Sequence, residues 1–122
     1  MSTTFGLHRA VLFNRDGVAT LFEDRRRTWA EVAERVARLA GALRELGVGR
    51  GDRVAILMLN QDRYLELYLG VAWAGAVVAP LNIRWTAQEN QDCAAPIPDV
   101  EARRPNLPVF FTPEGRQDAQ RA

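Results

Sequence analysis

The chain has 122 residues, 48% of them hydrophobic, with 16 basic residues against 15 acidic ones; this fits one small globular domain and excludes a disordered or collagen-like chain. The formal net charge of +1 gives no general reason to expect nucleic acid or an anionic membrane as a partner. The single cysteine, Cys93, excludes an internal disulfide, and the absence of Lys excludes Schiff-base or lysine-assisted chemistry within these residues.

No segment has the pattern of a targeting signal or a membrane span. The first 13 residues lack the apolar core of a signal peptide. Residues 64–81 form the most apolar stretch and have about the length of a short membrane span, but Glu66, Gly70, Gly75 and Pro80 interrupt it. We therefore expect a cytoplasmic protein without a membrane span.

Residues 18–23 (VATLFE) are β-branched and aromatic, which predicts a short strand. The following residues, Asp24 to Arg27, predict a turn that leads into a second short strand. Two interpretations of the three arginines were weighed. A solvated hairpin tip is favoured over a nucleic-acid-binding patch, because such a patch needs more basic residues on one face and acidic residues flank this one.

Thr28 and Glu31 have the spacing of a capping box, which marks the start of a helix. Apolar residues then recur at helical spacing and predict an amphipathic helix that Gly47 ends in a left-handed conformation: Trp29, Val32, Ala33, Val36, Leu39, Ala40, Leu43 and Leu46. The glycine-rich residues 47–52 leave a helix and enter a strand. That order is the reverse of a phosphate-binding loop.

A strand, a helix and a second strand are predicted over residues 53–81. Residues 53–59 (RVAILML) have the continuous apolar pattern of a parallel strand covered on both faces. Asn60 is a candidate N-cap for a helix over residues 61–74, which is apolar nearly all round and is therefore expected to be buried. Residues 76–81 predict the second strand, so the three elements form a βαβ unit with parallel strands.

Thr86 and Glu89 form a second capping box, and the prolines that follow allow about two helical turns. Five of the six prolines lie beyond Glu89. We expect residues 90–122 to be a divergent and largely irregular tail.

Four segments together resemble the opening of an AMP-forming acyl-CoA synthetase, a member of the adenylate-forming enzymes. They are residues 7–10 (LHRA), 27–32 (RTWAEV), 43–55 (LRELGVGRGDRVA) and 73–85 (WAGAVVAPLNIRW). Their order and spacing match the family over roughly residues 5–89, and the ending Asn82 to Trp85 is most similar to the fatty-acyl-CoA ligase branch. After Glu89 the match fades, which either an internal deletion or a frameshift would explain.

The resemblance implies an α/β fold, here a partial N-terminal subdomain of the adenylate-forming fold with an incomplete sheet. It implies the family reaction, in which ATP, a carboxylate and coenzyme A give acyl-CoA, AMP and pyrophosphate, and a place in fatty acid metabolism. The complete family uses ATP, Mg²⁺ and CoA. Its phosphate loop, adenine- and ribose-binding motifs and catalytic Lys are absent from these 122 residues. We therefore expect a truncated or remnant ligase that is inactive alone, with no catalytic, cofactor-binding or metal-binding residue and no cofactor of its own.

A few single residues were weighed against this expectation. His8 and Cys93 stand alone in the sequence and are more often structural than ligands or nucleophiles. The aromatic residues Tyr64, Tyr68, Trp73 and Trp85 could line an acyl pocket in a complete enzyme, although core packing is the commoner role.

The alternative function is a small non-catalytic interaction module that pairs with another chain. Residues 54–59 are hydrophobic, strand-forming and uncharged, which is typical of an aggregation-prone segment. The strand partners and covering helices that later sequence would supply are expected to be missing, so we expect a partner chain or self-association through exposed strand edges.

Overall fold

The computed structural model describes residues 3–94 and 109–111. These residues form two compact units, and each is described by itself. The first unit comprises residues 3–50 and 60–76, and the second comprises residues 51–59, 77–94 and 109–111. In the described part of the chain, no helix is long and apolar enough to cross a membrane.

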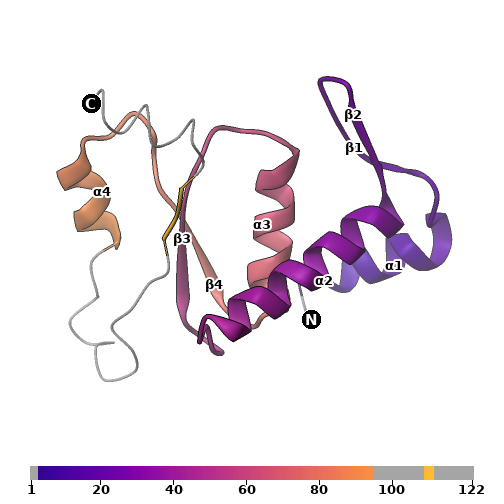
Figure 1. Cartoon of the computed structure of the whole chain (residues 1–122), viewed down its shortest axis with the longest axis horizontal. Coiled ribbons are helices and arrows are strands. Elements are labelled where there is room, and N and C mark those ends of the chain that lie inside the picture. The colour runs from indigo at the N-terminus through magenta and orange to yellow at the C-terminus, as the bar shows by residue number, and fades with distance from the viewer. Residues whose placement is uncertain (1–2, 95–108, 112–122) are drawn as a thin grey trace. The chain divides into compact units, whose positions relative to one another are not determined.

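The first unit contains three helices and a two-stranded hairpin (Figure 1). In chain order they are α1 (Phe5–Asn14), β1 (Val18–Phe22), β2 (Arg25–Thr28), α2 (Trp29–Glu45) and α3 (Asp62–Trp73). The predicted capping box at the start of α2 is confirmed: the Glu31 amide donates to Thr28 Oγ1 at 3.2 Å, and the Thr28 amide donates to Glu31 Oε2 at 2.7 Å. Gly47 follows the helix with a φ of 89°, as predicted.

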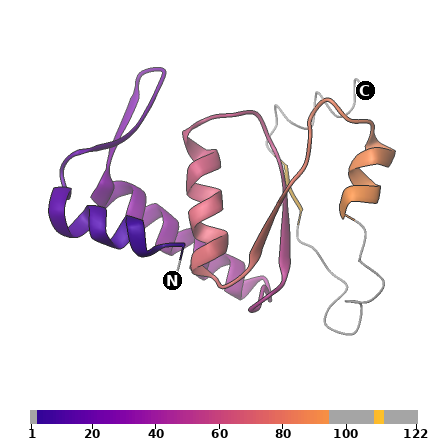
Figure 2. The same cartoon turned by 180° about the vertical axis from the view of Figure 1, so that it is seen from behind.

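The core of the first unit lies between α1 and α2, which pack against each other (Figure 2). Leu7 of α1 is buried with Val32 and Val36 of α2, and Trp29, Ala33, Leu69, Trp73 and Ala19 pack around them. The buried positions of α2 repeat at the helical spacing that the sequence indicated. Removing these side chains from water is the main source of stability in a unit of this size.

Helix α3 differs from its prediction in two respects. The N-cap is Gln61 rather than Asn60, and its side chain makes no capping hydrogen bond. The helix is not buried all round: Asp62 and Glu66 are buried, whereas Leu65 is 41% and Tyr68 39% exposed. The reason is that α3 turns its carboxylates toward cations of α2 and β2, so that part of its apolar surface faces outward.

The hairpin is antiparallel, with Leu21 opposite Arg26 and Phe22 opposite Arg25. The turn lies at Glu23 and Asp24, and Glu23 adopts a φ of 54°. The arginines therefore belong to β2 itself, and the prediction of a solvated hairpin tip is wrong for Arg25 and Arg27, which are partly buried. Alternation along a strand places these two on one face and leaves Arg26 exposed on the other.

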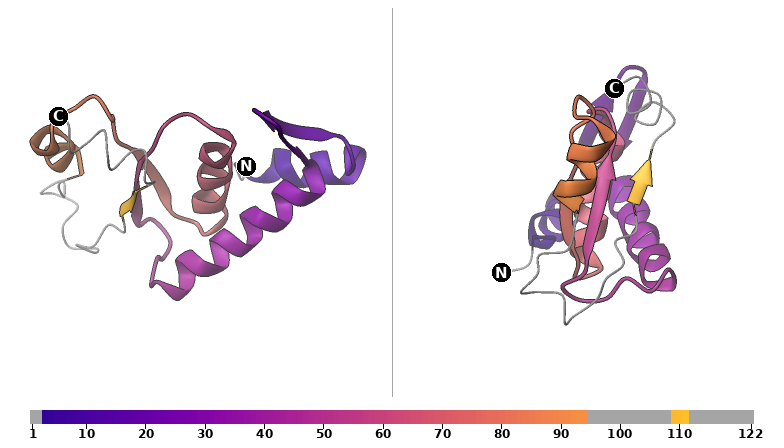
Figure 3. Two further views of the ribbon diagram at one scale, coloured as in Figure 1. Left: turned by 45° about the horizontal axis from the view of Figure 1, so that its top comes forward. Right: turned by 90° about the vertical axis from the view of Figure 1, so that its left-hand side faces the viewer.

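The second unit is a three-stranded sheet with one helix. Its elements are β3 (Arg53–Leu57), β4 (Val77–Pro80), α4 (Ala87–Ala94) and β5 (Val109–Phe111). The strand order is β4-β3-β5, and both neighbours run parallel to β3 (Figure 3). The predicted parallel pairing of the strands at 53–59 and 76–81 is thus confirmed.

Strand β3 is the central strand of the sheet, and its residues from Val54 to Leu57 are buried. It has a strand neighbour on each side, so the expectation that it lacks strand partners is wrong. Residues 109–111 supply one of those neighbours. The local sequence pattern could not predict this pairing, because the two strands lie more than 50 residues apart in the chain.

Helix α4 begins at the second predicted capping box. The Glu89 amide donates to Thr86 Oγ1 at 3.2 Å, and the Thr86 amide donates to Glu89 Oε2 at 2.8 Å. Buried Asn90 donates from Nδ2 to the Asn82 carbonyl at 3.0 Å, which ties the preceding loop to the helix. The helix has the expected length of about two turns. The described elements together show the predicted α/β class with a small, partial sheet of parallel strands.

Candidate functional site

Five charged side chains of the first unit are joined by ion pairs and are called here the charge cluster: Arg25, Arg27, Arg35, Asp62 and Glu66. Arg25 Nη2 lies 2.8 Å from Asp62 Oδ1. Glu66 Oε1 lies 3.1 Å from Arg27 Nε and 2.8 Å from Arg35 Nε. The cluster therefore connects three elements, β2, α2 and α3.

Local periodicity explains why each element presents its charges together. Residues two apart in a strand share a face, which aligns Arg25 with Arg27. Residues four apart in a helix also share a face, which aligns Asp62 with Glu66. These two spacings are visible in the sequence. The predictions of solvated arginines and of a helix that is apolar nearly all round did not indicate the cluster.

The cluster is shielded from water mainly on its acidic side. The side chains of Asp62 and Glu66 are 1% and 6% exposed, whereas that of Arg35 is 42% exposed. The hydrogen bond to Glu66 raises the pKa of Arg35 above its ordinary value, although burial acts in the opposite direction. Three guanidinium groups thus face two carboxylates, and this arrangement supports structure rather than acid–base chemistry.

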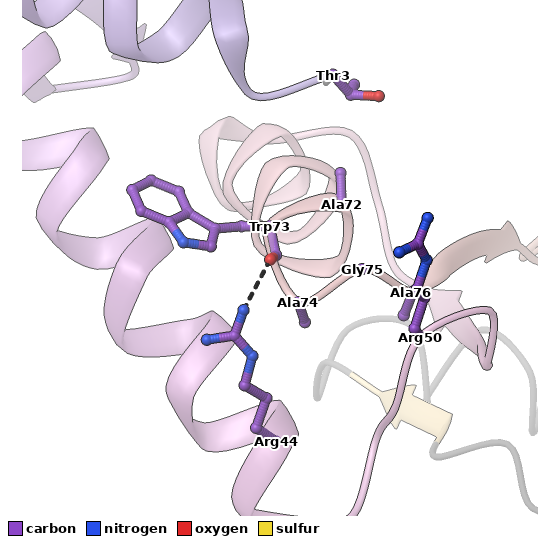
Figure 4. A pocket seen from close by; sticks show the side chains of 8 residues that line it. All are labelled: Thr3, Arg44, Arg50, Ala72, Trp73, Ala74, Gly75 and Ala76. Atoms are coloured by element: carbon purple, nitrogen blue, oxygen red, sulfur yellow. Dashed lines mark hydrogen bonds between the residues drawn. The ribbon is translucent and has the colours of Figure 1, made fainter. Parts of the chain in front are cut away.

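A shallow cavity of about 420 Å³ lies at the end of α3 (Figure 4). It is lined by Thr3, Arg44, Arg50 and residues 72–76. Arg44 Nη2 donates to the Trp73 carbonyl at 3.0 Å, so its charge lies against a helix C-terminus. The lining contains neither a carboxylate nor a histidine, and its two arginines stay protonated, so it offers no group suited to general acid–base catalysis.

The single residues that the sequence suggested as candidates are spread over both units. His8 is exposed on α1, its Nδ1 is 2.8 Å from the Thr4 carbonyl oxygen, and its ring centroid is 4.6 Å from that of Trp73. Trp73 packs against the core of the first unit, as core packing predicts. Trp85 is 39% exposed in the second unit. Cys93 lies in α4, but its side chain is outside what the structure describes.

Tyr64 and Tyr68 stack on α3, with ring centroids 5.2 Å apart. Burial raises the pKa of the Tyr64 hydroxyl to about 12, and the neighbouring Tyr68 adds to the shift. Such a shift keeps the hydroxyl protonated and makes it a weaker acid than an ordinary tyrosine. Among the described residues, no group of three or more His, Cys, Asp or Glu side chains is placed to hold a metal ion.

The sequence model of the family described as AMP-binding enzyme matches residues 7–97. This chain belongs to the AMP-binding enzyme family. The matched span runs from α1 through α4 and includes all four segments that the sequence analysis singled out. The family assignment expected from those segments is therefore confirmed.

Characterised AMP-binding enzymes with similar sequences are acid–thiol ligases. A 2-succinylbenzoate–CoA ligase from Arabidopsis thaliana is 43% identical over 83 residues, covering 68% of this chain and 15% of the relative. A long-chain-fatty-acid–CoA ligase from Thermus thermophilus is 47% identical over 83 residues, covering 66% of this chain and 15% of the relative. The chain thus spans about a seventh of the length of these relatives.

Solved AMP-binding enzymes show the same fold. A protein assigned as a long-chain-fatty-acid CoA ligase from Rhodopseudomonas palustris has a TM-score of 0.74 and 33% identity, covering 78% of this chain and 24% of that one. A fatty acyl CoA synthetase from Mycobacterium tuberculosis has a TM-score of 0.70 and 26% identity, covering 95% of this chain and 27% of that one. The chain therefore corresponds to about a quarter of the length of these solved relatives and shares their fold over that part. The expectation that it matches only part of a complete family member is thus confirmed.

Proposed function

We propose that these residues form the opening scaffold of an AMP-forming acyl-CoA ligase in the cytoplasm, and that residues 5–89 carry this role while residues 90–122 diverge. In the complete family, ATP activates a carboxylate as an acyl-adenylate and coenzyme A then displaces AMP. The substrate class is a carboxylic acid, and the Asn82 to Trp85 ending favours a fatty acid.

The observation that carries the proposal is the unequal coverage of the solved relative. A match that covers 78% of this chain but only 24% of the Rhodopseudomonas enzyme means that most of a ligase lies outside these residues. The residues that would bind nucleotide, metal and thiol in the family have no counterpart here, and we propose that none of the described residues takes over those roles.

The described residues also do not fit ATP, Mg²⁺ or CoA by their chemistry. Both buried carboxylates, Asp62 and Glu66, already face arginines, which removes them as magnesium ligands. The chain has no Lys to stabilise a transferring phosphoryl group. We therefore derive no catalytic step within this chain.

A chimera tests the proposal directly. Residues 7–89 of this chain would replace the corresponding segment of the Thermus long-chain-fatty-acid–CoA ligase. We expect fatty-acid-dependent release of pyrophosphate from ATP by the chimera and none by the 122-residue chain alone. A folded chimera without activity, or activity of the chain alone above a boiled control, would refute the scaffold role.

A second candidate function, a non-catalytic interaction module without a nucleic-acid partner, is favoured by the outer face of α1. Phe13 and Leu12 are 80% and 81% exposed there, and Phe5 is 51% exposed. Large apolar side chains grouped on one surface often mark a protein interface. Analytical ultracentrifugation of the chain at micromolar concentration distinguishes the two functions. An interaction module should form a defined oligomer, and the double substitution Leu12→Ser and Phe13→Ser should dissociate it into monomers.

A further inference from the structure

The two halves of the β1–β2 hairpin are held in different ways. At its base, the Trp29 amide donates to the Gly17 carbonyl at 3.1 Å, and the Ala30 amide donates to the Arg15 carbonyl at 3.0 Å. These backbone hydrogen bonds need no charged side chain. Farther out, Leu21 is 70% exposed, and the side chains of Arg25 and Arg27 join β2 to α3 through guanidinium–carboxylate contacts. The outer half is therefore held by charge rather than by apolar packing.

The two carboxylates of the charge cluster have different partners. Among the described residues, the ion pairs of Asp62 are both with arginines of β2, Arg25 at 2.8 Å and Arg27 at 3.7 Å. Glu66 contacts Arg27 of β2 but also Arg35 of α2. The contacts of Asp62 thus join the hairpin to α3, whereas those of Glu66 join α2 to α3 as well.

Only one oxygen of Asp62 accepts hydrogen bonds among the described residues. Its Oδ1 accepts from Arg25 Nη2 and from the Arg63 amide at 3.0 Å. Its Oδ2 is buried and has no hydrogen-bond partner among the described residues, with Arg27 Nε at 3.7 Å. The substitution Asp62→Asn would remove the negative charge that faces two arginines and would keep a side-chain oxygen that can accept from the Arg63 amide.

We propose that Asp62 is a charge-dependent switch that fixes the outer half of the hairpin against α3 and releases it when the carboxylate becomes neutral. The charged groups around it are Arg25 and Arg27 from β2, Arg35 from α2, and Arg63 and Glu66 from α3. Glu23 and Asp24 lie in the hairpin turn, and Glu31 on α2 accepts a hydrogen bond from the Thr28 amide. The switch is independent of the proposed ligase function.

Limited trypsin digestion at neutral pH tests the switch through charge removal. The chain contains Arg but no Lys, so the hairpin cleavage sites are Arg25, Arg26 and Arg27. For Asp62→Asn we expect cleavage there to rise by about tenfold or more, because proteolysis follows the population of the open form. Cleavage at Arg35 and Arg38 in α2 should change by less than about twofold in the same digest.

Glu34→Gln is the matched control, because Glu34 pairs with Arg38 on the exposed side of α2 and touches no member of the charge cluster. This variant should digest like the parent chain. Equal hairpin cleavage in Asp62→Asn and the parent would overturn the proposal. A second variant, Arg25→Gln, leaves the buried carboxylate in place. If cleavage rose equally at the hairpin and α2 sites in both Asp62→Asn and Arg25→Gln, that result would also overturn the proposal.

Discussion

Gly70 of α3 lies so close to Leu39 of α2 that a Cβ on Gly70 would be 2.6 Å from Leu39 Cδ2 and 2.9 Å from Cγ. The absence of a side chain at Gly70 therefore allows these two helices to approach each other. This explains why a helix interior keeps a residue that costs about 1 kcal/mol of helix propensity relative to Ala.

We expect Gly70→Ala to lower the free energy of unfolding by about 1 kcal/mol, because overpacking of about 1–3 kcal/mol exceeds the gain in propensity. In a Leu39→Ala background the sign should reverse, since the methyl group then has space. Urea denaturation of the four variants measures both effects. Gly41→Ala is the control: a Cβ there meets nothing within 4 Å, so this change should stabilise α2.

Two neighbouring arginines of β2 should differ strongly in their contribution to stability. Arg27→Ala is expected to cost about 2 kcal/mol, because it leaves the buried Asp62 and Glu66 with fewer partners. Arg26→Ala should stay within about 0.5 kcal/mol, because Arg26 is exposed. Equal midpoints of chemical denaturation for the two variants would show that the charge cluster adds nothing to stability.

Thr28→Ala should destabilise the chain by about 1 kcal/mol through loss of the hydrogen bond from the Glu31 amide. Thr28→Ser retains a hydroxyl at this position and should recover most of that stability. Thermal unfolding followed by circular dichroism compares the three proteins. A serine variant as unstable as the alanine variant would assign the effect to the Thr28 methyl group instead.

The raised pKa of Tyr64 predicts a loss of stability in alkali. The Tyr64 hydroxyl has a pKa of about 12 in the folded chain, against about 10 in an unfolded one. Between these values the unfolded chain releases the proton and the folded chain retains it, so the free energy of unfolding falls as pH rises. The contribution is fully present below pH of about 10.

Tyr64→Phe should remove this part of the alkaline slope, and absorbance at 295 nm should show one late-titrating tyrosine fewer. Urea denaturation of both proteins on the two sides of that pH window gives the slopes. Identical slopes would mean that Tyr64 ionises equally well in the folded and unfolded chains.

Several features of this protein followed from its sequence. The Thr28–Glu31 capping box and the apolar stripe behind it specify α2, because both the cap and the amphipathic face arise within a few residues. The continuous apolar run after Arg53 specifies a buried parallel strand. The ordered set of segments up to Trp85 identified the ligase family, a conclusion that rests on resemblance and that the family match over residues 7–97 confirmed.

Only the tertiary structure showed that the arginine face of β2 packs against the carboxylate face of α3. The alternation that aligns Arg25 with Arg27, and the helical turn that aligns Asp62 with Glu66, are local patterns. Their pairing joins residues 37 and 39 positions apart, and no short window of sequence contains both partners. The apolar composition of α3 suggested a fully buried helix, yet the arginines of β2 and α2 stabilise its two carboxylates inside. A carboxylate can be buried only where the fold brings an oppositely charged side chain next to it. The composition of α3 alone therefore could not show that Asp62 and Glu66 are buried.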